Sequence, residues 1–186
     1  MNGKSYQKTT LNLSLTNYQT KALEILLLLL VGVLIATLRA HLRIPMNIPG
    51  RHGIEVMAIL ISARMISQQS FASSITMLAT SAMMFLPFMG FKDPTAPFMY
   101  MGVGLLLDYF WNKFSLNSKN MFMLALFGGL VYMLIPILRI GFHFSSIYVI
   151  TSFVKHGIIL PIFTHFIFGF VGTLLGLGII KSIKRK

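Results

Sequence analysis

Residues 25–38 read "ILLLLLVGVLIATL", a stretch in which no side chain carries a charge. This stretch is the centre of an apolar segment from Ala22 to Leu38, and Lys21 and Arg39 flank that segment. A helix of about 20 predominantly apolar residues is long enough to cross the ~30 Å hydrocarbon core of a bilayer. The stretch therefore predicts a transmembrane helix, and with it a protein that folds in a membrane.

The rest of the chain is also strongly apolar. Hydrophobic residues make up 55% of the 186 residues, charged residues make up only 11%, and the mean hydropathy is +0.77. These values lie outside the range of soluble domains. Five more apolar segments follow the first: 54–66, 71–89, 96–111, 121–138 and 157–180. The segment 54–66, with about 13 residues and ~20 Å of helix, is short for a span.

These segments predict an all-α integral membrane protein. We expect a compact bundle of about six transmembrane helices, with irregular outer loops, over residues 20–181. A polar N-terminal tail, residues 1–19, precedes the bundle, and a basic tail, residues 182–186, follows it. The first tail lacks the continuous apolar core of a cleavable signal peptide.

The composition excludes several classes of function. Cysteine is absent, which excludes disulfides, thiolate nucleophiles and Cys-ligated zinc. Transmembrane helices fill the chain, so a soluble catalytic domain does not fit beside them. The net charge of +12, from 16 Lys and Arg against 4 Asp and Glu, indicates orientation in a membrane rather than nucleic-acid binding. We expect contact with the lipid bilayer, and no nucleic-acid partner, cofactor or metal.

The distribution of basic residues predicts the orientation. With the N-terminus in the cytoplasm, ten Lys and Arg residues fall on inner segments and six on outer segments. Cytoplasmic loops of membrane proteins carry such an excess of positive charge. The C-terminal "KSIKRK", residues 181–186, contributes most to it. We expect a multi-pass protein of the cell (inner) membrane with both termini in the cytoplasm.

The first outer segment concentrates polar groups. Residues 39–55 read "RAHLRIPMNIPGRHGIE" and hold three arginines and two histidines. Guanidinium groups suit bidentate binding of a carboxylate or phosphate. The prolines and glycines disfavour regular helix, and irregular backbone at membrane depth is tolerated where it lines a cavity. The segment predicts an anion site with Arg51 as the first contact, supported by Arg43, Asn47 and His52 and oriented by Glu55. The alternative is that the arginines reach lipid headgroups.

Two further outer segments are expected to complete this site. Residues 90–97, "GFKDPTAP", contribute Asp93, which alternatively pairs with Lys92 in solvent. Residues 141–157, "GFHFSSIYVITSFVKHG", resemble a re-entrant or lid segment and contribute His143 and Tyr148 for stacking on a flat ligand. Aromatic residues at this position also form belts at the headgroup level, which is the alternative for the second segment.

The first apolar segment carries a stripe of small residues. Gly32, Ala36 and Ala40 recur at a spacing of four, and the same spacing separates Gly172 from Gly176. Small residues at this spacing let another helix approach closely. The stripe either packs within the bundle or receives a partner membrane protein.

Six short helices, a small-residue stripe on the first and a site in the outer loops together resemble the substrate-binding S component of an energy-coupling factor vitamin transporter. Residues 43–64, with "RIPMNIPGRHGIE" leading into "AILISAR", are similar to the biotin-type S components, in which a proline-containing loop precedes a short second helix. The resemblance implies a coupling subunit docked on the stripe and two ATPases that drive release. Residues 160–178 lack a biotin-type signature, so the resemblance does not identify the substrate.

We therefore expect the substrate-binding subunit of an uptake transporter that captures a small, vitamin-like, anionic molecule. The chain has no phosphate-binding loop, so energy from ATP must come from partner subunits. One alternative is a scaffold or assembly protein of the membrane, whose basic loops contact lipid headgroups.

Another alternative is an intramembrane metal-dependent enzyme. His52 and Glu55 would share a helix face, but the sequence lacks both the H-E-x-x-H and the G-x-S-x-G pattern, so we expect no catalytic residues. Two other acids, Glu24 and Asp108, lie near cytoplasmic helix ends. There we expect snorkelling, or pairing with Lys21 and Lys113 respectively.

Overall fold

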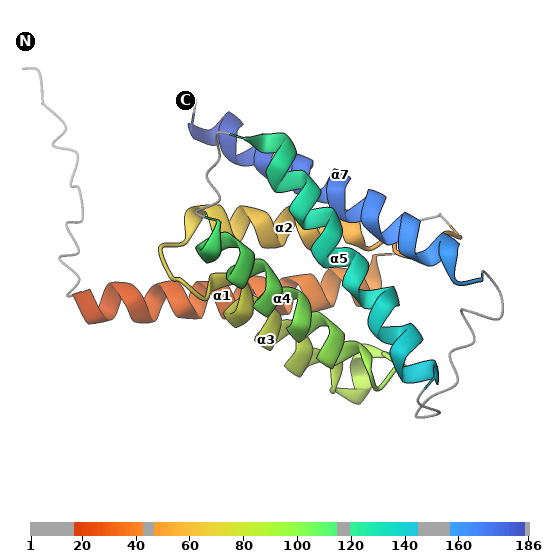
Figure 1. Cartoon of the computed structure of the whole chain (residues 1–186). Helices are drawn as coiled ribbons and strands as arrows, with labels where there is room; N and C mark the ends of the chain where they lie inside the picture. The colour runs from red at the N-terminus through yellow and green to blue at the C-terminus, as the bar shows by residue number, and fades with distance from the viewer. Residues whose placement is uncertain (1–16, 43–46, 115–119, 145–156, 185–186) are drawn as a thin grey trace, which may run out of the picture.

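A computed structural model describes residues 17–42, 47–114, 120–144 and 157–184. These ranges contain helices and no strand (Figure 1). The helices are α1 (Asn17–His41), α2 (Gly53–Ile66), α3 (Ala72–Met84), the 3₁₀ turn η1 (Pro87–Met89), α4 (Ala96–Lys113), α5 (Met121–Phe144) and α7 (Ile159–Lys184). Each of the six predicted apolar segments overlaps one of the α-helices over most of its length. The predicted all-α bundle is confirmed.

Three helices have the length and apolar composition needed to cross a membrane: α1, residues 121–142 of α5, and α7. The short second segment is also confirmed, because α2 has 14 residues, or about 21 Å. The third segment forms a shorter helix than predicted. α3 ends at Met84, and Pro87 opens η1, since proline lacks the N–H that would continue an α-helix.

The helices enclose one apolar core. The most extensive helix contacts are those of α7 with α5 and α2, and those of α3 with α4 and α1. Ile35 of α1, Met57 and Leu60 of α2, Met99 of α4 and Leu177 of α7 are fully buried in this core. In Figure 1 the N-terminal part of α1 extends beyond the rest of the bundle.

The outward face of α1 remains apolar. Its Leu26, Leu27, Leu30 and Leu34 side chains are each about half exposed, and only 22% of its apolar window is buried. A continuous apolar surface of this extent is unfavourable in water but favourable against the hydrocarbon chains of lipids. Together with the three helices of sufficient length, this face marks the chain as a membrane protein.

The small residues of α1 serve packing within the chain. Gly32 and Ala36 are buried, and a side chain at Gly32 would clash with the carbonyl oxygen of Thr76 on α3. Thr80 of α3 also donates a hydrogen bond of 2.9 Å to the carbonyl oxygen of Gly32. Ala40, the third member of the stripe, is half-buried. For Gly32 and Ala36 the structure thus favours packing within the bundle, the first of the two alternatives for the stripe, because both residues are buried within the chain.

Candidate anion-binding site

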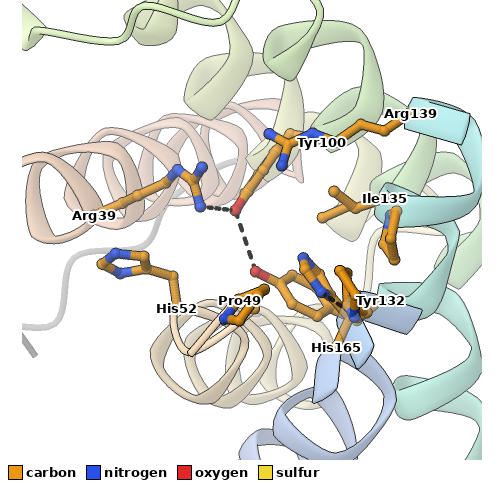
Figure 2. A pocket seen from close by; sticks show the side chains of 11 residues that line it. Arg39, Pro49, His52, Tyr100, Tyr132, Ile135, Arg139 and His165 are labelled. Atoms are coloured by element: carbon orange, nitrogen blue, oxygen red, sulfur yellow. Dashed lines mark hydrogen bonds between the residues drawn. The ribbon is translucent and has the colours of Figure 1, made fainter. Parts of the chain in front are cut away.

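A cavity of about 120 Å³ lies at one end of the bundle, where five helices converge (Figure 2). Its walls come from the C-terminal part of α1, the segment that leads into α2, the N-terminal parts of α4 and α7, and α5. Five of its polar side chains are aromatic or basic residues that the cavity brings together from distant parts of the chain: Arg39, Tyr100, Tyr132, Arg139 and His165. His52, from the start of α2, is the sixth.

Arg39 is held by two tyrosines. Its Nη1 atom donates a hydrogen bond to the Tyr100 hydroxyl, and its guanidinium carbon lies 4.7 Å from the centre of the Tyr100 ring. The Tyr100 and Tyr132 hydroxyl oxygens are 3.3 Å apart, and both side chains are fully buried. Figure 2 shows the three residues as a continuous chain of hydrogen bonds. The tyrosines fix the guanidinium in place but do not neutralise it.

The charge of Arg39 has no counterion in the described part of the chain. No carboxylate there lies within ion-pair distance of its guanidinium. Its Nε atom is buried and lacks a hydrogen-bond partner. A polar group that is buried without a partner costs free energy, and a charged group costs more. An anion that enters the cavity would remove this cost.

Arg139, in contrast, is paired. Its Nη2 atom lies 2.6 Å from Oδ2 of Asp93. Thr95 donates two more hydrogen bonds to Oδ1 of Asp93, from its backbone nitrogen at 2.9 Å and from its hydroxyl at 2.6 Å. Asp93 thus pairs with Arg139, not with Lys92 as in the alternative interpretation, and the pair joins the loop before α4 to α5.

This pair makes stability depend on pH. Burial raises the pKa of the Asp93 carboxyl, but the hydrogen bonds from Thr95 and the charge of Arg139 outweigh burial and hold the pKa below its ordinary value. A lowered pKa stabilises the fold above the unfolded-state pKa of about 4, and the contribution is lost as the pH falls through the folded-state value. We expect melting temperatures measured from pH 6 to pH 3 to fall further for the wild type than for Asp93→Asn. Parallel curves would contradict this role of Asp93.

His52 and Glu55 form a second local pair. The Nδ1 atom of His52 donates a hydrogen bond to Oε1 of Glu55, while Oε2 of Glu55 is buried without a partner. Glu55 thus orients an imidazole on the cavity wall. Across the described ranges, no group of three His, Asp or Glu side chains is arranged to hold a metal ion.

His165 is fixed from two sides. Its ring stacks on Tyr132 with centroids 5.4 Å apart, and its Nδ1 atom lies 2.7 Å from the carbonyl oxygen of Pro161. A carbonyl oxygen only accepts hydrogen bonds, so Nδ1 carries the proton and Nε2 holds the lone pair of the neutral ring. His165 therefore presents a flat ring with a defined tautomer.

Gly50 closes the cavity over His165. Its φ of +83° suits glycine, and a Cβ atom at this position would lie 2.6 Å from Nδ1 of His165. We expect Gly50→Ala to displace the His165 ring and to lower the melting temperature more than Gly90→Ala does. Gly90 is the matched control because its φ is +73° and its surroundings are open, so alanine there adds only backbone strain of about 1–2 kcal/mol. Equal losses would show that Gly50 does not support His165.

The structure brings only some of the predicted site residues to the cavity. His52 lines the cavity, Glu55 contacts His52, and Asp93 contacts Arg139. Asn47 is exposed and Arg51 is half-buried, and neither lines the cavity. Arg43 and Tyr148 lie outside the described residues. The same holds for the side chain of His143, whose backbone belongs to α5.

Four polar residues of the lining, Tyr100, Tyr132, Arg139 and His165, were not assigned to the site from the sequence, and Arg39 was left between an anion site and lipid headgroups. One signal was present for His165, because an ionisable residue within an apolar segment indicates function by default. Arg139 directly follows the predicted segment 121–138 and gave no such signal. The two tyrosines gave no signal, since tyrosines are common in apolar helices. Their pairing depends on how α4 and α5 pack.

Comparisons of this chain with models of protein families, with curated proteins and with solved structures found no match. The arguments for function therefore come from the geometry of this cavity and from the sequence.

Proposed function

We propose that this chain is the membrane-embedded substrate-binding subunit of an uptake transporter for small anionic molecules. The observation that carries the proposal is the guanidinium of Arg39, which is fixed by tyrosines in a cavity and has no counterion among the described residues. A membrane protein that keeps a cation of this kind gains most when an anion binds beside it.

The position of the cavity supports access from the outer side. The C-terminal ends of α1 and α5 and the N-terminal ends of α2, α4 and α7 surround it. The excess of Lys and Arg on the other segments supports an orientation with this end outside the cell membrane and both termini in the cytoplasm. A solute from outside therefore reaches Arg39 without crossing the bundle.

Energy for uptake must come from other subunits, because the sequence has no phosphate-binding loop. The resemblance to S components of energy-coupling factor transporters supplies the expected partners, a transmembrane coupling subunit and ATPase subunits. The proposal gives the chain no catalytic step and no cofactor.

Native mass spectrometry of the protein, purified gently from its own membranes, tests this proposal. We expect a retained small acid together with coupling and ATPase subunits. A protein that carries only lipids and unrelated membrane proteins would contradict the proposal and favour a membrane scaffold. The arginines of the first outer segment would then act as headgroup anchors.

A further inference from the structure

We propose that the ligand of this cavity is a monovalent anion no larger than a single-ring carboxylate such as benzoate, and that Arg39 binds its carboxylate. This inference rests on the proposed function and narrows the substrate class of the same site. Three observations carry it: the ion pairs on the cavity wall, the hydrogen bonds of the Arg39 guanidinium, and the cavity volume.

The charges on the wall leave room for one negative charge. Asp93 balances Arg139 at 2.6 Å, and Glu55 contacts His52. Of the two arginines on the wall, Arg39 is the one without a carboxylate within ion-pair distance in the described ranges. A monovalent anion would pair with Arg39 one to one, whereas a divalent anion would bring a second negative charge for which the wall offers no further unpaired arginine, and an unpaired buried charge costs free energy.

One nitrogen of the Arg39 guanidinium remains for a ligand in the cavity. Nη1 donates to the Tyr100 hydroxyl, and Nε is buried without a partner and without accessible surface. Nη2 is therefore the atom that meets a carboxylate oxygen first, and a small shift of the guanidinium would add Nε and complete a side-on bidentate pair. Tyr100 already orders the side chain, so little side-chain entropy is lost on binding.

The volume sets the size of the ligand. The cavity measures about 120 Å³, and a cavity of about 150 Å³ in another protein holds one benzene molecule. Pockets for drug-sized ligands measure about 300–1,000 Å³. The walls add flat surfaces, because Tyr132 and His165 are stacked with an interplanar angle of 25°. The volume therefore sets a single ring as the upper limit of size, and these surfaces and this charge suit a planar group with one carboxylate.

A ligand series on the purified wild-type protein in detergent tests the inference. Isothermal titration with benzoate, benzamide, phthalate and biphenyl-4-carboxylate separates the effects of charge, valence and size. We expect benzoate to bind at least 100-fold more tightly than its neutral isostere benzamide, and more tightly than the divalent phthalate and the two-ring acid. Equal affinity for benzamide, or tighter binding of phthalate or of the larger acid, would overturn the inference.

Three variants test whether Arg39 binds the carboxylate. We expect Arg39→Gln to weaken benzoate binding at least 100-fold and Arg39→Lys, which keeps the charge but loses the fork, to weaken it about tenfold. Arg51→Gln is the matched comparison and is expected to retain affinity within threefold, because Arg51 does not line the cavity. Loss of binding in Arg51→Gln but not in Arg39→Gln would overturn the assignment. If Arg39→Gln does not fold, the wild-type ligand series still decides.

A variant with increased relative affinity for a divalent anion provides an independent test. Asp93→Asn removes the counterion of Arg139 and leaves a second uncompensated cation on the wall. We expect this variant to shift the ratio of phthalate to benzoate affinity about tenfold toward phthalate. An unchanged ratio would contradict the charge balance on which the inference depends.

The results also separate this inference from the proposed function. A larger or multiply charged acid retained in native mass spectrometry would refute the monovalent single-ring ligand and leave the uptake subunit standing. Failure of every anion to bind, together with a protein that purifies without any small molecule, would refute both.

Discussion

Replacement of Asp108 by alanine is expected to lower the free energy of unfolding by about 3–5 kcal/mol, because it leaves a buried guanidinium without its counterion. Asp108 is 1% exposed, and its Oδ1 atom lies 3.1 Å from Nε of Arg64, which is 5% exposed. Asp108 also accepts hydrogen bonds from the backbone nitrogens of Ser73 at 3.2 Å and Ser74 at 2.7 Å, and from the Ser74 hydroxyl at 2.7 Å. One carboxylate thus joins α2, α3 and α4.

The protein contains its own probe for this experiment. Trp111 is the single tryptophan of the chain, and its ring centre lies 4.9 Å from the guanidinium carbon of Arg64. Reversible unfolding in mixed micelles, driven by increasing sodium dodecyl sulfate and followed by Trp111 fluorescence, reports the free energy directly. A loss below 1 kcal/mol in Asp108→Ala would contradict the buried pair.

Two controls separate the charge from the packing. The double variant Arg64→Met/Asp108→Leu is expected to be more stable than Asp108→Ala, because it removes both charges instead of stranding one. Glu24→Ala is the comparison at a partly exposed site. Glu24 accepts hydrogen bonds from the Ser67 hydroxyl at 2.6 Å and the Gln69 side chain at 2.8 Å, but it is only partly buried, so we expect a loss of about 0–1 kcal/mol.

Both acids differ from their predicted partners. The sequence favoured pairing of Asp108 with Lys113, but Asp108 pairs with Arg64, and Lys113 donates a hydrogen bond to the Tyr109 hydroxyl at 2.8 Å. Glu24 binds the segment between α2 and α3. These contacts join residues 43–44 positions apart along the chain, and no local pattern encodes such a pairing.

Arg64 and Arg39, at opposite ends of the bundle, have different partners. At the end opposite the cavity, Arg64 has a carboxylate, the carbonyl oxygen of Gln69 at 3.0 Å and the side-chain oxygen of Asn112 at 3.1 Å. At the cavity, Arg39 has a tyrosine hydroxyl and no carboxylate in the described residues. The first arrangement holds helices together, whereas the second leaves a charge for a ligand. This contrast within one chain is the strongest argument that the cavity binds an anion.

Sequence patterns predicted the helices much better than the site. An apolar run such as residues 25–38 determines that a helix forms, because its length and composition match a bilayer. A helix that is apolar on every side does not determine its own rotation, however. Whether Arg39 points toward lipid or toward α4 therefore depends on how α1 packs on α3. The sequence therefore left open whether Arg39 reaches lipid headgroups, and it gave the first ligand contact to Arg51, which does not line the cavity.

The close contact of α7 with α2 at Gly172 leads to a second stability prediction. A Cβ atom at Gly172 would lie 2.6 Å from the carbonyl oxygens of Gly53 and Ile54, and these backbone atoms cannot move aside as a side chain can. We expect Gly172→Ala to cost about 3 kcal/mol, measured by the same mixed-micelle unfolding. It is also expected to weaken benzoate binding, because α2 carries His52 and α7 carries His165, so separation of the two helices opens the cavity.

Gly178 gives the matched control on the same helix. A Cβ atom there has no neighbour within 4 Å, so Gly178→Ala is expected to gain up to about 1 kcal/mol from the higher helix propensity of alanine. Opposite signs for the two substitutions would establish that backbone contact between α2 and α7, rather than helix propensity, decides the result. If Gly172→Ala were as stable as Gly178→Ala, α2 and α7 would not approach as closely as described. The argument that their contact supports the cavity wall would then also be contradicted.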